Sequence, residues 1–179
     1  MKATYEDLQA FPDDGKRHEI IDGEHFVTPS PETGHQAIAV SLVVLLGNFL
    51  DAHALGKVFV APLDVVFSDT DVVEPDLIFV AAEHADRITR KNIQGAPDLV
   101  IEILSPSTRK ADEVIKRKLF ERFGVAEYWV VDPELETVKV YRRAEKGFAR
   151  VAELSKEAGE MLTTPLLPGF AAPLEKIFA

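Results

Sequence analysis

Four residues in this sequence have the side chains and the surroundings that metal-assisted hydrolysis would need. Asp76 and Glu102 are acids within apolar, strand-like runs, where a charge is costly unless another group compensates it. Glu19 is a third acid on a shorter strand-like run, and Lys116 is the candidate cation. Carboxylates bind hard divalent cations such as Mg²⁺, and a nearby lysine can orient a water or neutralise a scissile phosphate. Two acids with one lysine are therefore sufficient for phosphodiester hydrolysis, although a buried Glu–Lys pair can also be purely structural.

The placement of the lysine depends on residues 97–132. This segment has the pattern of a buried strand that carries Glu102, a polar loop, an amphipathic helix and a second buried strand. We expect the helix to run from near Ser107, its expected N-cap, to Gly124, which suits a left-handed C-terminal cap. At 100° per residue its inward face contains Asp112, Ile115, Lys116, Leu119 and Phe123. The lysine is thus predicted to face the core, one loop away from the buried glutamate.

The acid on the first strand depends on an N-terminal hairpin. A capping pattern predicts a short helix over residues 5–11, followed by strands at residues 17–21 and 24–28. The dipeptide Asp22-Gly23 between the strands is a strong hairpin signal. Glu19 either points inward on this hairpin or lies exposed on an edge strand, and the pattern alone does not separate the two.

A long helix is expected over residues 32–54 and is apolar almost all round from 37 to 50. We expect this run to be too short and too interrupted to span a bilayer. It is predicted to be a core helix that is also partly covered by a second subunit, which makes a homodimer the expected assembly. His35 and Gln36 lie in its first turn, where they are weaker candidates for ligand contact, since a lone histidine there is more often a surface or capping residue.

The remaining segments predict strands at residues 57–67 and 72–80, a short helix and loop at 82–96, and a hairpin at 137–143 and 148–154. Asp64 is a weaker site candidate within the first of these strands. Pro75 implies a strand start, an edge or a bulge beside Asp76. Ser105 is a further weak candidate, because the loop after a core strand is a usual place for a ligand. The whole pattern predicts one domain, residues 1–179, of the α/β or α+β kind, with a mixed sheet flanked by helices.

Composition narrows the cellular and chemical context. The chain of 179 residues is 46% hydrophobic and 28% charged, and it has no cysteine, which excludes disulfides and thiolate chemistry. The first residues, MKATYEDLQAF, include acids at positions where a signal peptide would have an apolar block, so we expect a cytoplasmic protein without a membrane segment. The net charge of −10 argues against a nucleic-acid partner. Residues 109–150, however, carry 11 basic and 8 acidic side chains, and this local excess is either a nucleic-acid surface or an ordinary solvated one.

Six segments of the chain resemble one known family. They are HEIIDGE at 18–24, PSP at 29–31 with HQ at 35–36, APLDV at 61–65, EPDL at 74–77, PDLVIEILSPST at 97–108 and EYWVVDP at 127–133. In this order they resemble the Uma-two family of endonucleases, within the PD-(D/E)XK superfamily, over roughly residues 4–178. The resemblance implies a restriction-endonuclease-like fold with an N-terminal β-hairpin, a Mg²⁺ or Mn²⁺ cofactor, and DNA as the substrate.

The resemblance also implies roles for individual residues. In the superfamily, an acid after proline, an acid on the next core strand and a lysine two positions later hold Mg²⁺ and the attacking water. Asp76 matches the first acid and Glu102 the second, but Leu104 stands where the lysine would be. Lys116 matches a lysine that has moved to the following helix, and Glu19 matches an extra acid for the metal.

Two rival interpretations stay open at this point. The overall acidity and the lack of a separate DNA-reading module favour a non-catalytic, dimeric binding or regulatory protein on a nuclease-like fold. A nuclease that acts on RNA, or on branched or single-stranded DNA, fits the same residues.

Overall fold

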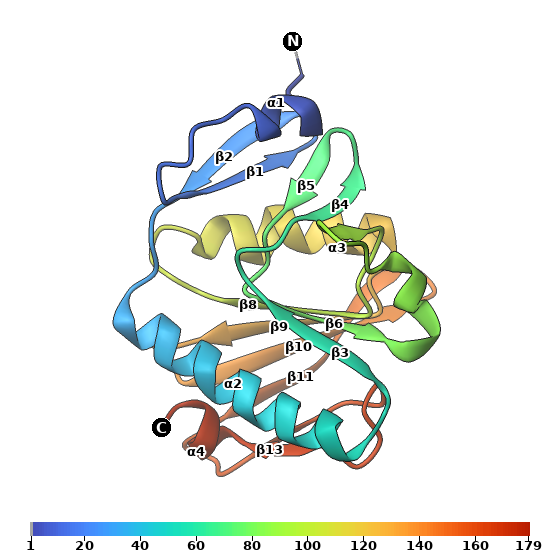
Figure 1. The fold of residues 1–179 in the computed structure, drawn as a ribbon. Coiled ribbons are helices and arrows are strands. Elements are labelled where there is room, and N and C mark those ends of the chain that lie inside the picture. The colour runs from blue at the N-terminus through green and yellow to red at the C-terminus, as the bar shows by residue number, and fades with distance from the viewer. Residues whose placement is uncertain (1) are drawn as a thin grey trace.

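A six-stranded mixed sheet forms the centre of the molecule (Figure 1). The computed structural model describes residues 2–179. The strand order is β11-β10-β9-β8-β6-β3, and β8 and β9 are parallel while the other neighbours are antiparallel. The strands are β3 (Gly56–Val60), β6 (Leu77–Ala81), β8 (Leu99–Ile103), β9 (Glu127–Asp132), β10 (Thr137–Ala144) and β11 (Gly147–Ser155). Their apolar side chains fill both faces, which explains the nearly continuous Val and Ile runs of the central strands.

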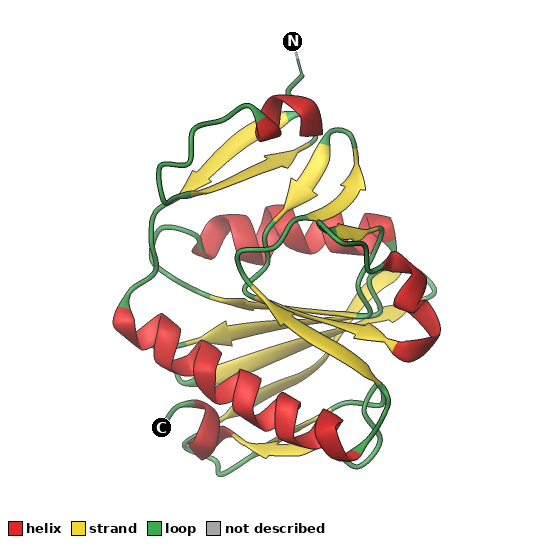
Figure 2. Ribbon diagram, in the orientation of Figure 1, coloured by secondary structure: helices red, strands yellow, loops and turns green. Residues whose placement is uncertain are grey.

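Helices cover both faces of this sheet (Figure 2). Helix α2 (Thr33–Ala52) packs on one face together with the C-terminal strands β12 (Met161–Thr163) and β13 (Ala171–Pro173) and helix α4 (Leu174–Ile177). The opposite face is covered by η2 (Ala111–Lys116), α3 (Arg117–Phe123) and a second, smaller sheet. Side chains alternate along a strand, so in β8 Leu99 and Ile101 face α2, whereas Val100 faces α3. Glu102 therefore points to the α3 side.

The smaller sheet has the order β2-β1-β5-β4-β7. Its strands are β1 (Arg17–Ile21), β2 (Glu24–Thr28), β4 (Val65–Ser68), β5 (Asp71–Val73) and β7 (Ile93–Gln94). The predicted hairpin is confirmed, with Asp22 and Gly23 both at positive φ in its turn. The prediction of single strands at 57–67 and 72–80 is wrong, because each run is divided between the two sheets. Pro62 and Pro75 lie at the divisions, where they need donate no hydrogen bond to a strand partner.

The first two helices follow the predictions closely. Helix α1 (Tyr5–Gln9) opens with the expected capping box between Thr4 and Asp7. Helix α2 buries Ile38, Leu42 and Leu46 against the large sheet. The expectation that α2 is too short to span a bilayer is wrong by length and composition, since it has 20 residues with few charges. That evidence is weak, because the core helix of a soluble protein meets the same criteria.

The helix after β8 differs from the predicted one in its first turns. Arg109 and Lys110 are α-helical, and the π-helical segment η2 follows them. Ser107 makes no capping bond to this helix; its hydroxyl lies 3.1 Å from that of Ser105 instead. Gly124, at φ +84°, ends α3 as predicted. Asp112, Lys116 and Leu119 are buried as expected, and Ile115 and Phe123 are partly buried against the same core; Phe120 is also buried, which was not predicted. The wider π-helical turn changes the phase of the residues that follow it. The segment 82–96 forms the predicted short helix, η1 (Ala82–Arg87), with β7 after it.

Candidate active site

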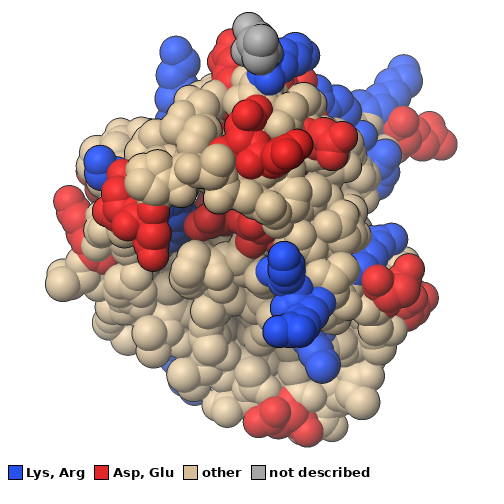
Figure 3. Space-filling model, turned by 45° about the horizontal axis from the view of Figure 1, so that its top comes forward, with Lys and Arg blue, Asp and Glu red and all other residues tan. Residues whose placement is uncertain are grey.

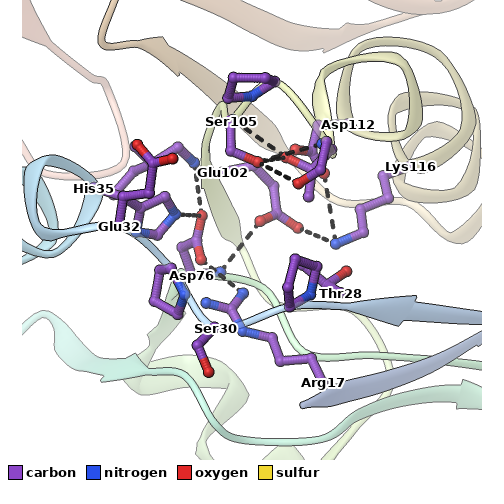
Figure 4. Close-up of a pocket in the computed structure, with 16 residues that line it drawn as sticks. Arg17, Thr28, Ser30, Glu32, His35, Asp76, Glu102, Ser105, Asp112 and Lys116 are labelled. Atoms are coloured by element: carbon purple, nitrogen blue, oxygen red, sulfur yellow. Dashed lines mark hydrogen bonds and ion pairs between the residues drawn. The ribbon is translucent and has the colours of Figure 1, made fainter.

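A pocket of about 170 Å³ lies where the two sheets meet (Figure 4). Ionisable side chains from five parts of the chain line it: Arg17 from β1, Glu32 and His35 from the start of α2, Asp76 just before β6, Glu102 from β8, and Asp112 and Lys116 from η2. The carboxyl end of β8 and the start of α2 both open onto this space, as expected for a ligand site in an α/β protein.

Lys116 occupies the middle of a buried acidic cluster. Its side chain is only 6% exposed, and its Nζ lies 2.8 Å from Glu19 Oε1, 2.8 Å from Glu102 Oε1 and 3.6 Å from Asp112 Oδ1. Burial alone would lower the pKa of Lys116, but these three carboxylates outweigh burial and raise that pKa well above its usual value. The three carboxylates therefore favour the charged form of Lys116.

The acids around the lysine are more numerous than it can neutralise. Burial raises the pKa of Glu102 well above its usual value, against the opposing charge of Lys116, and the neighbouring acids raise it further. Burial likewise raises the pKa of Asp112 to about 6. An additional cation in the pocket would relieve both effects.

Asp76 is held by groups from three different elements. Its Oδ2 accepts a hydrogen bond from the Ile103 backbone N–H at 2.7 Å and lies 3.0 Å from His35 Nε2, while Oδ1 lies 2.7 Å from Arg17 Nη1. Burial would raise the pKa of Asp76, but the His35 hydrogen bond and the Arg17 charge lower it to about 2. The Asp76 backbone N–H also donates to Glu102 Oε2 at 3.3 Å, so the two acids are fixed side by side.

Glu19 completes the cluster from the smaller sheet. The interpretation of this residue as an exposed edge position is wrong, since it is buried and its Oε1 accepts from the Glu74 backbone N–H at 2.8 Å. Arg17 was not predicted as a site residue, although a signal was present. It lies two positions before Glu19 on the same strand, so both side chains lie on one face.

The weaker candidates divide into two groups. His35 and Ser105 line the pocket, with Ser105 Oγ bonded to Thr108 Oγ1 at 3.0 Å. Gln36 lies outside it, in an adjoining hollow. Asp64 is also outside, where it accepts from the Tyr5 hydroxyl at 3.2 Å.

The donor set suits a metal that needs few protein ligands. Within residues 2–179, no group of three or more His, Asp or Glu side chains is arranged to hold a metal by itself. Mg²⁺ commonly uses only one or two carboxylates, with waters and substrate phosphates as its other ligands. Four formally charged acids surround two cations, Arg17 and Lys116, and this excess of negative charge matches a divalent cation. Asp76 and Glu102 together therefore fit the expected metal.

The surface gives less guidance about a partner. Among the described residues on the face in Figure 3, acidic and basic side chains are interspersed over the upper part, while the lower part is mainly uncharged. That face carries no continuous basic surface of the kind that usually follows a nucleic-acid backbone.

The fold and the comparisons define the class of the protein. The mixed sheet with its flanking helices is a restriction-endonuclease-like fold. Among solved structures, the crystal structure of a “putative nuclease belonging to DUF820” from Anabaena variabilis ATCC 29413 matches with a TM-score of 0.81 and 22% identity. That match covers 98% of this chain and 97% of the other.

The sequence itself identifies the family. The sequence model of Uma2, described as “Putative restriction endonuclease”, matches residues 3–175, and the chain belongs to this family. Membership indicates a restriction-endonuclease-like nuclease with a nucleic-acid substrate. The type IIG restriction endonuclease BpuSI is also similar, at 13% identity over 84% of this chain and 16% of that one, but its TM-score of 0.43 is too low to support an argument. No curated protein matches the sequence.

Proposed function

We propose that the protein is a metal-dependent endonuclease that hydrolyses DNA phosphodiester bonds. Asp76 and Glu102 would hold Mg²⁺ or Mn²⁺. Lys116 would orient the attacking water and stabilise the charge that develops on the phosphate. One observation carries the proposal: the Nζ of Lys116 lies 2.8 Å from Glu102, in the same pocket as Asp76, although the lysine comes from a helix and not from the strand.

Each residue of the chain would have a separate part in the reaction. A divalent cation held by Asp76 and Glu102 would supply Lewis-acid stabilisation of the phosphate charge. The Lys116 ammonium would orient a water through a hydrogen bond and stabilise charge as it develops on the phosphate oxygens. Glu19, which we expected as a third metal ligand, contacts Lys116 directly, so we assign it to positioning that ammonium. His35 would hold Asp76 in its orientation through the bond to Oδ2.

Nicking of supercoiled plasmid in the presence of Mg²⁺ or Mn²⁺ tests the proposal. We expect wild-type protein to nick, and Asp76→Asn, Glu102→Gln and Lys116→Ala each to lose on the order of 10²–10³-fold in rate, as when one preorganised charge-stabilising group is removed. Lys118→Ala is the matched control, because Lys118 is an exposed lysine of α3 close to Lys116 in sequence. It should nick as wild type does.

The opposite outcome would support a different function. If wild-type protein does not nick DNA or RNA with either metal, the non-catalytic binding protein becomes the better proposal. One observation favours that alternative: protein groups contact both oxygens of Asp76, which would also suit a purely structural cluster. A cytoplasmic location, expected from the composition, stays a prediction.

We also propose that the protein is a homodimer, formed through α2. Val40 and Val44 on this helix are 60% and 52% exposed, and Asp51 is the sole Asp, Glu, Lys or Arg among its 20 positions, in a chain with a net charge of −10. Two such chains repel each other least where neither presents charge, so a second copy is the expected occupant of this face. Sedimentation should give a dimer at micromolar concentration for wild type and a monomer for Val40→Lys with Val44→Lys.

A control at another exposed valine makes the dimer test specific. Val151→Lys, on the edge strand β11, adds one lysine at a valine that is 46% exposed, the same replacement that is made at each of the two α2 positions. It should leave the dimer intact. Wild-type protein that sediments as a monomer would contradict the assembly, as would a dimer that survives the two α2 substitutions.

A further inference from the structure

Arg17 lies at the boundary between the active-site pocket and an adjoining hollow of about 270 Å³ on α2. Its guanidinium approaches Asp76 from β1, while Lys116 lies on the other side of Glu102 (Figure 4). Arg17 Nη1 lies 2.7 Å from Asp76 Oδ1 and donates to the Glu74 carbonyl at 3.2 Å. The Arg17 side chain is 18% exposed and so has more contact with solvent than that of Lys116, which is 6% exposed.

The two oxygens of Asp76 are not equivalent. Oδ2 is fixed by the Ile103 backbone N–H and by His35. Oδ1 is buried and makes no hydrogen bond of acceptable geometry with any described residue, so the charge of Arg17 is its compensation. Oδ1 is therefore the oxygen through which Asp76 can bind a metal, and Arg17 stands beside it.

We propose that Arg17 is an exchangeable counter-ion: it neutralises Asp76 in the metal-free protein, leaves Oδ1 when a divalent cation binds, and then binds the scissile phosphate. This inference rests on the proposed function. Two cations that compete for one carboxylate oxygen oppose each other, so metal binding weakens the hold of Asp76 on Arg17. A guanidinium released at the edge of this pocket is well suited to a phosphate, because its planar N–H groups match two phosphate oxygens at once.

The inference predicts that one substitution changes metal binding and catalysis in opposite directions. Arg17→Gln removes the cation that competes with the metal for Asp76, so calorimetric titration with Mn²⁺ should give a Kd about tenfold lower than that of wild type. Tenfold corresponds to the smallest shift, about one pKa unit, that an adjacent cation usually causes in a carboxylate. The same variant should nick plasmid about 10²-fold more slowly at saturating metal, because the phosphate loses a charged donor.

Two further variants separate this role from a structural one. Lys16→Gln removes a neighbouring exposed cation that pairs with Asp14 at 3.5 Å, and it should leave both the Kd and the rate unchanged. Arg17→Lys keeps the charge and protects the fold, so it should bind Mn²⁺ as wild type does. It should still nick more slowly, since an ammonium cannot make the two-point contact. Thermal unfolding midpoints of all variants show whether each is folded during the titration.

The outcomes distinguish this inference from the proposed function. If wild type binds Mn²⁺ and nicks, but Arg17→Gln binds no more tightly, the counter-ion role is overturned and the nuclease stands. An Arg17→Lys variant that nicks at the wild-type rate overturns the phosphate role. If Arg17→Gln binds Mn²⁺ while wild type neither binds nor nicks, the counter-ion role stands and the nuclease falls. If neither protein binds Mn²⁺, both are overturned.

Discussion

Lys116→Ala should lower the free energy of unfolding by about 3–5 kcal/mol, the usual cost of removing one partner from a buried ion pair. The substitution leaves Glu19, Glu102 and Asp112 together in a buried space without the cation that lies within 3.6 Å of all three. Urea denaturation in the presence of a chelator, so that no metal replaces the lysine, measures the loss.

A double variant separates this loss of stability from the loss of catalysis. Lys116→Met combined with Glu102→Gln removes the lysine together with one of the two carboxylates that lie 2.8 Å from it, so it should recover part of the stability, while Glu19 and Asp112 still lack their cation. The double variant should still fail to nick DNA. If Lys116→Ala unfolds at the same urea concentration as wild type, the buried network does not exist in solution as described.

Asp112→Asn should stabilise the protein above about pH 6 and leave its stability unchanged near pH 4. The pKa of Asp112 is raised from 3.8 to about 6 on folding, so the folded state binds this proton more tightly than the unfolded state does. Its carboxylate therefore costs nothing below pH 3.8 and destabilises the fold fully above about pH 6. At 1.36 kcal/mol per pKa unit, the amide should gain about 3 kcal/mol at pH 8, as an order-of-magnitude value.

Urea denaturation of both proteins between pH 4 and pH 8, without metal, checks the sign and the range of this effect. Asp51→Asn, at an exposed position near the end of α2, is the control and should show no such slope. Asp76 has the opposite effect, because folding lowers its pKa to about 2 and its carboxylate therefore stabilises the fold. That stabilisation is lost as the pH falls from about 3.8 to 2. That loss is common to both proteins and cancels in the difference. An Asp112→Asn variant that is less stable than wild type at pH 8 would contradict the electrostatic account.

The central residues of the site could be predicted from the sequence because each follows from a local rule. Lys116 was placed on the inward face of its helix by the angle per residue, and the structure buries it against Glu102. Asp76 was singled out by the proline before it, and Glu102 by its apolar strand. Arg17 follows from the same rule that gives Glu19, since residues two apart on a strand share a face.

Other features could not be predicted because they depend on distant parts of the chain. The run 57–67 reads as one strand, and only the packing of two sheets shows that its halves belong to different ones. The π-helical turn of η2 has no clear signal in the sequence, and Ser107 was wrongly expected to cap the helix. The exposure of Val40 and Val44 likewise follows from how α2 sits on the sheet.

The division of the site between two sheets has a consequence for the order in which the protein becomes active. Its charged groups lie at positions 17, 19, 76, 102 and 116, so the pocket closes only through contacts between residues far apart in sequence. Contacts of that range form late, since each must overcome the entropy of closing a long loop. A chain still emerging from the ribosome, or one with the hairpin of β1 and β2 undocked, lacks part of the set. Cleavage of nucleic acid would thus be confined to the fully folded protein, and incompletely synthesised chains would not cleave the nucleic acid of the cell that makes them.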